Sequence, residues 1–436
     1  MLAAGMALPV LSPAAHAQDS WWESLGLGPQ TQAPRQRTSS QDESRPREAL
    51  NDLRPDATPF RSDAMVEAYD AAIQRYQEIV ARGGWQPING GRSVRAEDTD
   101  QVARLRRRLA MSGELRGARQ SYSSWGGGFD DDLEPAVRRY QQSNGLRVTG
   151  RVDKATLDAL NVPAAARLAQ LRLNQQRLRE LLSQRIEDRY VLVNAASFEL
   201  EAVDRHQVEL RHRVIVGKPE RQTPSVRATI KALNFFPYWR VPDSVASLDL
   251  IPKLVKEPEY LQQEQIRVLA GSYSGPEINA AAIEWRTADA AKIKFRQDPG
   301  PQNALGLVRL DMPNEHGVYM HDTPMKPLFH QRGRAFSAGC VRVQDVFTLA
   351  EWVAKNEAGW EQPGRAREVV AAGQPLDLTL TRPLPVYFSY ITAWVEPSGS
   401  IQFRADIYNR DGARELVAAY DREPGDEPPP RWSLAP

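Results

Sequence analysis

Cysteine is almost absent from this chain: among 436 residues, Cys340 is the only one. An intramolecular disulfide is therefore excluded, and so are metal sites that need several thiolates. The sequence also contains no H-E-x-x-H pattern, and no glycine-rich phosphate loop follows a predicted strand. We therefore predict a protein with no metal and no cofactor.

A strong charge of either sign is also missing, since the formal net charge is +1. Nothing in this balance favours nucleic acid as a partner. Hydrophobic residues make up 41% of the chain and charged residues 25%, which is ordinary for a soluble globular protein. No run approaches the roughly 18 apolar residues that span a bilayer, so no transmembrane segment is expected in the exported protein.

The first residues indicate export. Residues 1–11 are apolar, and Ala15 and Ala17 precede Gln18 in a small-x-small cleavage pattern, so we assign residues 1–17 to a signal peptide. The usual basic segment is missing, which leaves two interpretations: the true start lies upstream, or the signal is degraded. We favour an upstream start. An unpaired thiol in an oxidising compartment risks wrong pairing, so its presence there indicates a use.

Two segments of the sequence indicate how the thiol of Cys340 is used. Cys340 lies in RAFSAGCVRV, residues 334–343, where small neighbours leave room around the sulfur. A free cysteine is either a small buried hydrophobe or a nucleophile. Residues 316–324, HGVYMHDTP, alternate apolar and polar side chains, which predicts a short half-buried strand with Tyr319 and His321 on one face. A thiol and an imidazole on neighbouring elements favour the nucleophile.

These two blocks, together with PGPQNALG at residues 299–306, resemble the catalytic stretch of the L,D-transpeptidases of the YkuD-domain family, in particular their large Gram-negative periplasmic branch. Members of this family cross-link peptidoglycan stem peptides through the third residue of the donor. One position departs from the pattern: smaller members often have His immediately before the Gly-Cys pair, where this chain has Ala338. The resemblance implies a periplasmic enzyme that carbapenems inhibit covalently.

The resemblance also implies a two-step acyl transfer. His321 takes the proton of Cys340 to form a thiolate–imidazolium pair, the sulfur attacks the donor carbonyl, and D-alanine leaves. An acceptor amine, deprotonated by His321, then displaces the thioester. We expect backbone N–H groups around Gly339, with the Tyr319 hydroxyl, to hold the oxyanion.

Other polar residues receive supporting assignments. Arg342 is assigned to substrate binding because arginine grips carboxylates with two hydrogen bonds; a structural ion pair is the alternative. Ser337, as a support of the loop, and Tyr319 complete the predicted substrate-binding set. Asp322 is interpreted as a turn or supporting residue rather than the acid of a triad. His212, on a strand-like segment, is expected at the surface.

Composition and periodicity divide the chain. Residues 94–161 resemble the three-helix peptidoglycan-binding module, with the patterns Ala-Val-x-x-Tyr-Gln and Thr-Leu-x-x-Leu-Asn. Around it we predict a disordered tether at residues 18–60 and a helical scaffold in two parts, at residues 61–93 and 162–186. The catalytic domain is expected at residues 187–395, with an insert at about 244–297 that is either a lid or inert. A C-terminal hairpin with a disordered tail is expected at residues 396–436.

We therefore predict a multidomain α+β protein, with a small three-helix peptidoglycan-binding-like module and a mainly β YkuD-type catalytic domain that carries an inserted capping subdomain. The expected function is L,D-transpeptidation in cell wall biogenesis and cell shape, with peptidoglycan stem peptides and glycan as partners. Two alternatives stay open. One is an L,D-carboxypeptidase or endopeptidase on the same site, and the other is a non-catalytic wall-binding scaffold whose thiol is structural.

Overall fold

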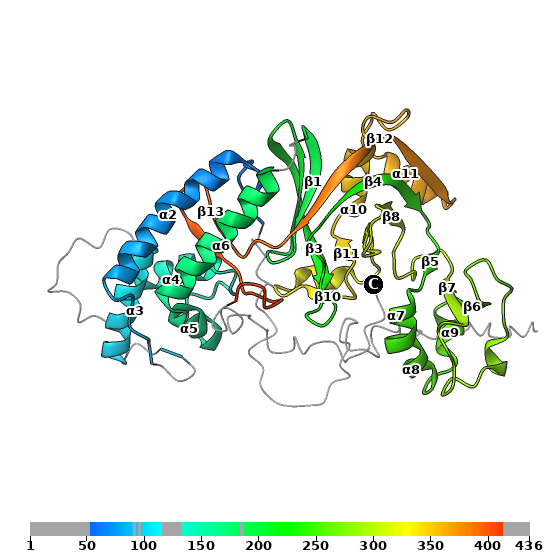
Figure 1. Ribbon diagram of the computed structural model, residues 1–436, viewed down its shortest axis with the longest axis horizontal. Helices are drawn as coiled ribbons and strands as arrows, with labels where there is room; N and C mark the ends of the chain where they lie inside the picture. Colours follow the sequence, from blue (N-terminus) through cyan, green and yellow to red (C-terminus); the bar gives the residue numbers. More distant parts are fainter. Residues whose placement is uncertain (1–52, 90–92, 95–96, 116–131, 184–186, 413–436) are drawn as a thin grey trace, which may run out of the picture.

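The computed structural model describes residues 53–89, 93–94, 97–115, 132–183 and 187–412. The predicted signal peptide, most of the predicted tether and the end of the predicted tail lie outside these residues. Figure 1 shows three regions side by side: a helical region at the left, a large sheet in the centre and a smaller insert at the right. The predicted multidomain α+β architecture is confirmed.

Two long helices lie next to the sheet. α2 (Asp63–Ala81) begins where the Ser62 hydroxyl accepts a hydrogen bond from the backbone, and it ends before Gly83, which has φ +91°. α6 (Ala164–Ser183) packs against α2, and both helices bury apolar side chains around Trp394. Both helices are expected from the periodicity of the sequence and are confirmed.

A separate small core belongs to three shorter helices, α3 (Thr99–Ser112), α4 (Leu133–Ser143) and α5 (Lys154–Asn161). The buried Gln141 amide on α4 ties this core together. It donates to the Arg151 carbonyl at 2.8 Å and to the Thr156 hydroxyl at 3.0 Å. A buried amide is stable only when its polar atoms are paired in this way, so Gln141 holds the turn before α5 in place.

The central sheet closes on itself. Its strands are β1 (Arg189–Asn194), β2 (Glu199–Asp204), β3 (Gln207–Gly217), β4 (Val226–Phe235), β8 (Val308–Asp311), β9 (Met320–His321), β10 (Ala335–Ser337), β11 (Val341–Val343) and β12 (Leu376–Ser389). They follow the order β3-β11-β9-β8-β4-β12-β1-β2, and β2 pairs back with β3, while β10 pairs with β3 in addition. A closed sheet encloses an apolar core, to which α10 (Val346–Ala354) and α11 (Arg365–Ala372) contribute.

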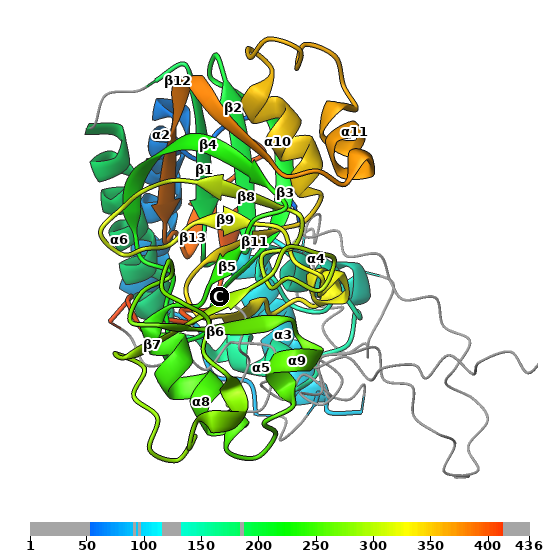
Figure 2. The ribbon, with the colours of Figure 1, turned by 90° about the vertical axis from the view of Figure 1, so that its right-hand side faces the viewer.

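An insert leaves this sheet after β4 and returns before β8. Its core includes Trp239, Leu254 and Phe295, and Phe336 from the Cys340 segment belongs to the same core. The insert therefore packs against the segment that carries Cys340, and Figure 2 shows it below β9 and β11. Its elements are β5 (Trp239–Arg240), α7 (Asp243–Val245), the π-helical turn η1 (Ala246–Leu250), α8 (Ile251–Leu254), α9 (Tyr260–Gln263), β6 (Ile266–Ala270) and β7 (Ile293–Gln297).

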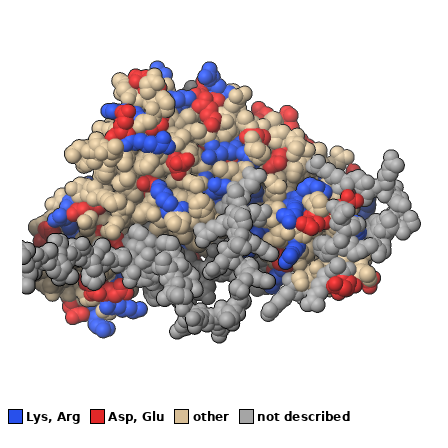
Figure 3. Space-filling model, turned by 180° about the vertical axis from the view of Figure 1, so that it is seen from behind, with Lys and Arg blue, Asp and Glu red and all other residues tan. Residues whose placement is uncertain are grey.

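The end of the described chain forms the predicted hairpin. β13 (Ala393–Val395) pairs antiparallel with β14 (Ile401–Phe403), and residues 404–412 follow. Within the described ranges, no helix is both long and apolar enough to cross a membrane. On the face shown in Figure 3, basic and acidic side chains are interspersed, in line with the net charge of +1.

Candidate active site

Cys340 and His321 lie on neighbouring strands of the closed sheet. His321 ends β9, Cys340 immediately precedes β11, and the parallel register of the two strands sets His321 opposite Arg342. The ring centroids of Tyr319 and His321 are 5.6 Å apart. The Val341 N–H donates to the Tyr319 carbonyl at 2.9 Å. The fold thus gathers the predicted thiol, imidazole, phenol and guanidinium at one place.

This site is more buried than the sequence pattern predicts. Cys340 is only 6% exposed, and His321 and Arg342 are fully buried at 0%. The prediction of a half-buried strand is wrong, because Met320 packs in the barrel core while Tyr319 also contacts the core of the insert. The alternating pattern predicts that the face with Tyr319 and His321 is exposed to solvent, whereas the insert packs over it. The local pattern cannot predict this contact, because the insert is a separate part of the chain.

Burial controls the ionisation of both reactive groups. The pKa of His321 is lowered to about 3, first by burial and then by the charge of Arg342. The pKa of Cys340 is raised to about 11 by burial, against the lowering effect of hydrogen bonding to Tyr319. At neutral pH the resting site therefore holds a neutral thiol and a neutral imidazole, so the thiolate–imidazolium pair predicted for the reaction has to form by proton transfer from Cys340 to His321.

The imidazole is available for proton transfer. Neither ring nitrogen of His321 has a hydrogen-bond partner among the described residues, so the thiol and the imidazole are not hydrogen-bonded in this structure. Burial and Arg342 lower the pKa of His321, and the backbone of Leu305 acts in the opposite direction. Catalytic hydrogen bonds often tighten only when substrate binds, and Cys340 and His321 have to come into hydrogen-bond contact before the thiol can pass its proton to the imidazole.

We expect alkylation of Cys340 by iodoacetamide to accelerate continuously as the pH rises to about 10. The thiolate is the reactive form, and a pKa raised to about 11 keeps its fraction small at neutral pH. The rate, followed by mass spectrometry, should rise about tenfold per pH unit. A rate that levels off below about pH 7 would instead indicate an ion pair with His321.

Ser337 and Gly339 shape the turn that presents Cys340. The Ser337 hydroxyl donates to the Cys340 carbonyl at 2.6 Å and accepts from the Gly339 N–H at 3.1 Å. Gly339 has φ +124°, a conformation that favours glycine. Because the Gly339 N–H is already bonded within the turn, the oxyanion donors that we consider are the Cys340 N–H and the Tyr319 hydroxyl.

A hydrogen-bond network that sequence analysis missed supports this turn. The buried Thr223 hydroxyl donates to the Gly339 carbonyl and accepts from the Gly217 N–H, both at 2.9 Å. The Tyr408 hydroxyl donates to the Gly217 carbonyl at 2.6 Å and accepts from the Thr223 N–H at 3.3 Å. Thr223 and Pro224 mark a turn in the sequence, but no local signal links them to Tyr408.

Residues 406–411 hold Tyr408 in turn. The Tyr408 N–H donates to the Tyr390 hydroxyl at 2.9 Å, and that hydroxyl donates to Asp406 Oδ1 at 2.7 Å. The two tyrosine rings stack with centroids 5.1 Å apart, and the Arg410 guanidinium lies over both. The end of the predicted C-terminal hairpin and the residues just after it are therefore part of the support of the Cys340 turn.

Thr223→Val is expected to slow acylation of Cys340 by a carbapenem about tenfold or more, whereas Thr223→Ser retains the rate. Valine has a similar shape but leaves the Gly339 carbonyl and the Gly217 N–H unpaired, at about 1–3 kcal/mol each. Acylation is followed by mass spectrometry and thermal unfolding by calorimetry. Equal acylation rates per folded molecule for both variants would show that Thr223 has no positioning role.

Asp322 has contacts that fit the predicted supporting role. Its Oδ2 accepts from the Leu307 N–H at 3.0 Å, and its Oδ1 pairs with the Lys326 ammonium. Gly306 has φ +61°, and a Cβ at this position would lie 2.4 Å from Asp322 Oδ2. The Asp322 carboxylate therefore fixes the turn at residues 305–307 and does not itself bond to the imidazole, while the backbone of Asp322 and that of Leu305 both act to raise the pKa of His321.

Other candidate ligand residues add no metal site. The prediction that His212 is at the surface is wrong: it is 6% exposed, and its Nδ1 lies 2.9 Å from the Gln344 carbonyl, because the chain after β11 covers it. Among the residues that the structure describes, no group of three His, Cys, Asp or Glu side chains is placed to hold a metal ion.

Comparisons with known proteins agree with this architecture. The family model of the "L,D-transpeptidase catalytic domain" (YkuD) matches residues 188–371, and the model of the "Putative peptidoglycan binding domain" matches residues 98–160. A "Putative L,D-transpeptidase" of Haemophilus influenzae is 34% identical over 244 residues, which cover 55% of this chain and 48% of the relative. The chain therefore spans about half the length of this curated relative.

Two solved structures are also similar. An L,D-transpeptidase from Xylanimonas cellulosilytica has 13% identity and a TM-score of 0.21, covering 70% of this chain and 98% of that one. An L,D-transpeptidase (Yku) from Stackebrandtia nassauensis has 12% identity and a TM-score of 0.24, covering 69% and 95%. These TM-scores are too low to support an argument about the fold.

The fold is a closed sheet covered by an insert, with a buried thiol and an imidazole on neighbouring segments. This domain is joined to a small helical module. Residues 188–371 match an L,D-transpeptidase catalytic domain of the YkuD type, and a match to a peptidoglycan-binding domain precedes it.

Proposed function

We propose that this protein is a periplasmic L,D-transpeptidase that cross-links peptidoglycan by cysteine acyl transfer. Cys340 is the nucleophile and His321 the acid and base. The observation that carries the proposal is the pairing of β9 with β11, which sets the single thiol of the chain beside an imidazole within the matched catalytic domain. A thiol and a neutral base on adjacent strands are suited to acyl transfer.

In the first step, the sulfur of Cys340 forms a bond to the donor carbonyl carbon while its proton passes to His321. The Cys340 N–H and the Tyr319 hydroxyl donate hydrogen bonds to the oxyanion. The carbon–nitrogen bond to D-alanine then breaks, and His321 returns the proton to the departing amine. A thioester on Cys340 remains.

In the second step, an acceptor amine attacks the thioester carbonyl. Its proton passes to the neutral His321, the carbon–sulfur bond breaks, and the proton returns to the sulfur. Because the pKa of His321 is lowered by burial, the imidazole is neutral and ready to act as a base at each step.

The insert acts as a lid over this site. Its π-helical turn η1 presents Leu248, which is 60% exposed, and Asp249 pairs with Arg221 in the turn beside Thr223. A covered site excludes water, which favours an acceptor amine over hydrolysis. A carboxypeptidase or endopeptidase on the same Cys340 is the second candidate, and it requires water to reach the thioester.

The proposal includes location and role. A peptidoglycan-binding domain beside a transpeptidase domain supports a cell-wall-associated protein with stem peptides and glycan as partners. Export to the periplasm by the signal peptide at residues 1–17, a part in cell wall biogenesis and cell shape, and acylation by carbapenems follow from the same proposal.

The test is incubation of the full protein with tetrapeptide-bearing muropeptides, followed by mass spectrometry. Cross-linked dimers with loss of D-alanine are the expected products. Tripeptides without dimers would identify a carboxypeptidase. If neither product forms and a carbapenem leaves Cys340 unmodified, the proposed acyl transfer is wrong.

A further inference from the structure

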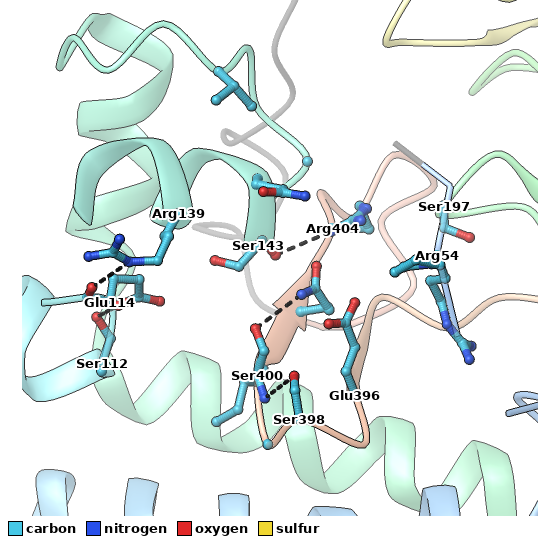
Figure 4. A pocket seen from close by; sticks show the side chains of 18 of the residues that line it. Arg54, Ser112, Glu114, Arg139, Ser143, Ser197, Glu396, Ser398, Ser400 and Arg404 are labelled. Atoms are coloured by element: carbon cyan, nitrogen blue, oxygen red, sulfur yellow. Dashed lines mark hydrogen bonds between the residues drawn. The ribbon is translucent and has the colours of Figure 1, made fainter. Parts of the chain in front are cut away.

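A polar cavity of about 590 Å³ lies apart from the proposed reaction centre. Neither Cys340 nor His321 lines it; its walls come from the ends of α3 and α4, the hairpin loop at residues 396–402, and the chain around Phe198. Figure 4 shows Ser143 on one side of the hollow and the hairpin serines on the other. The volume falls within the range of about 300–1,000 Å³ that is usual for small-molecule sites.

The charge of this cavity favours an anion. Among the described lining residues, basic side chains outnumber acidic ones, with Arg54, Arg75, Arg139, Arg332 and Arg404 against Glu114 and Glu396. Burial raises the pKa of Glu396, although Arg54 acts in the opposite direction. On the face shown in Figure 3 the two signs are interspersed, and the net charge of the chain is only +1, so an excess of five arginines over two glutamates in one cavity is unusual for this protein.

The remaining lining favours a hydrophilic ligand. Small-molecule sites are mostly apolar, whereas this cavity is lined by hydroxyl and amide groups. They come from Ser112, Ser143, Ser398, Ser400, Gln142 and Gln402. Such groups both donate and accept hydrogen bonds, as hydroxyl and amide groups of sugars and peptides require.

One buried donor in the wall lacks a partner. Arg54 is 4% exposed; its Nη2 bonds to Asp56 Oδ1 at 3.0 Å and also to the Thr58 carbonyl, while its Nη1 has no hydrogen-bond partner among the described residues. A buried unpaired donor is unfavourable unless something else satisfies it. Because this nitrogen is buried, Arg54 contributes positive charge to the cavity wall rather than a direct contact to a ligand.

The cavity wall also contacts the Cys340 segment. The Arg334 guanidinium, at the start of that segment, donates to the Phe198 carbonyl at 3.1 Å and to the Val214 carbonyl at 3.2 Å. A ligand in the cavity therefore lies against the same part of the barrel that carries the nucleophile turn.

We propose that this cavity binds a carboxylate-bearing segment of a peptidoglycan strand, at the junction of the peptidoglycan-binding domain, the hairpin and the catalytic domain. The identity of the polymer rests on the proposed function. The carboxylate belongs either to a stem peptide or to the lactyl group of a muramyl sugar that carries no stem peptide, and both present an anion on a hydrophilic chain. This second contact holds the strand while another part of it reacts at Cys340.

The test compares two substitutions that each add one negative charge. Gln142 is exposed and lines the cavity, whereas Gln77 is exposed on α2 away from it. Both changes are made in full-length Cys340→Ala protein to prevent turnover, and affinity for soluble tetrapeptide-bearing glycan strands is measured by calorimetry. Gln142→Glu is expected to weaken binding roughly fivefold through charge repulsion, and Gln77→Glu to leave it unchanged.

Competition assigns the source of the carboxylate. Displacement by peptide-free glycan strands assigns it to the sugar, and displacement by free tetrapeptide assigns it to the stem; either supports the proposal. The proposal is overturned if Gln142→Glu and Gln77→Glu bind equally, or if neither competitor acts. The absence of dimers and tripeptides with the wild-type protein would instead count against the proposed function, because that assay does not depend on Gln142.

Discussion

Cys340→Ala is expected to abolish dimers, tripeptides and carbapenem adducts, with a rate loss on the order of a thousandfold or more. The substitution removes the only thiol in the chain, and with it the only group that we propose to carry the acyl intermediate. The protein should stay folded, because alanine leaves only a small cavity at this buried position. Mass spectrometry of products and adducts, with a thermal unfolding curve, checks both expectations.

The same variant separates the proposed enzyme from a wall-binding scaffold. A scaffold with a structural thiol predicts that product formation does not depend on Cys340 at all. Retention of the variant on insoluble wall material gives the matched control, since binding by the helical module does not use the sulfur. Wild-type amounts of dimer from Cys340→Ala would end the assignment of the nucleophile.

His321→Gln is expected to slow acylation of Cys340 about a hundredfold to ten-thousandfold. Glutamine has a similar size but cannot accept the thiol proton. Without this base, the raised pKa of Cys340 keeps nearly all of the thiol protonated at neutral pH. The remaining rate should therefore increase with pH more steeply than the wild-type rate, measured as carbapenem acylation between about pH 6 and about pH 9.

His316→Gln is the matched control for this prediction. His316 lies in the same segment and is exposed, and its Nε2 lies 3.6 Å from a carboxylate oxygen of the neighbouring Glu315. We expect the rate of Cys340 acylation in the His316→Gln variant to stay within about twofold of the wild-type rate, as is usual for substitutions at exposed positions. Equal losses in both variants would point to a general effect of the segment and contradict the role of His321 as base.

The neutral state of both groups has a consequence for turnover. A resting ion pair would make Cys340 reactive towards any electrophile, whereas a buried neutral pair reacts only when substrate brings proton donor and acceptor together. The insert over Tyr319 and the turn held by Thr223 both support this arrangement. Selectivity for the proposed donor then comes from how the site closes, and not from a permanently activated thiol.

Much of the secondary structure could be predicted from the sequence. The helix at Asp63–Ala81 shows apolar residues at three- and four-residue spacing and ends before two glycines, both local signals. The strands from Arg189 to Gly217 alternate or are bounded by turns, and the hairpin around Gly399 carries its own turn residue. The closure of the sheet has no such signal, because the pairings of β1 with β12 and of β3 with β11 join strands that lie far apart in the chain.

The candidate site was only partly predictable. The segments of Cys340 and His321 each carry a recognisable pattern, so their meeting on adjacent strands follows from the family resemblance. Their burial did not follow, because the cover comes from an insert with an independent core. The roles of Thr223 and Tyr408 could not be predicted from the sequence either, since their hydrogen bonds join residues far apart in the chain.

Residue types and their local order were sufficient to predict the two proposed reactive residues, Cys340 and His321, together with the helices, most strands and the family resemblance. Such features depend on neighbours along the chain, and the printed sequence contains those neighbours. The protonation of Cys340 and His321, the support of the Cys340 turn and the basic cavity at the domain junction needed the folded chain. Burial and electrostatic energies depend on which distant segments pack together, and only long-range contacts establish that.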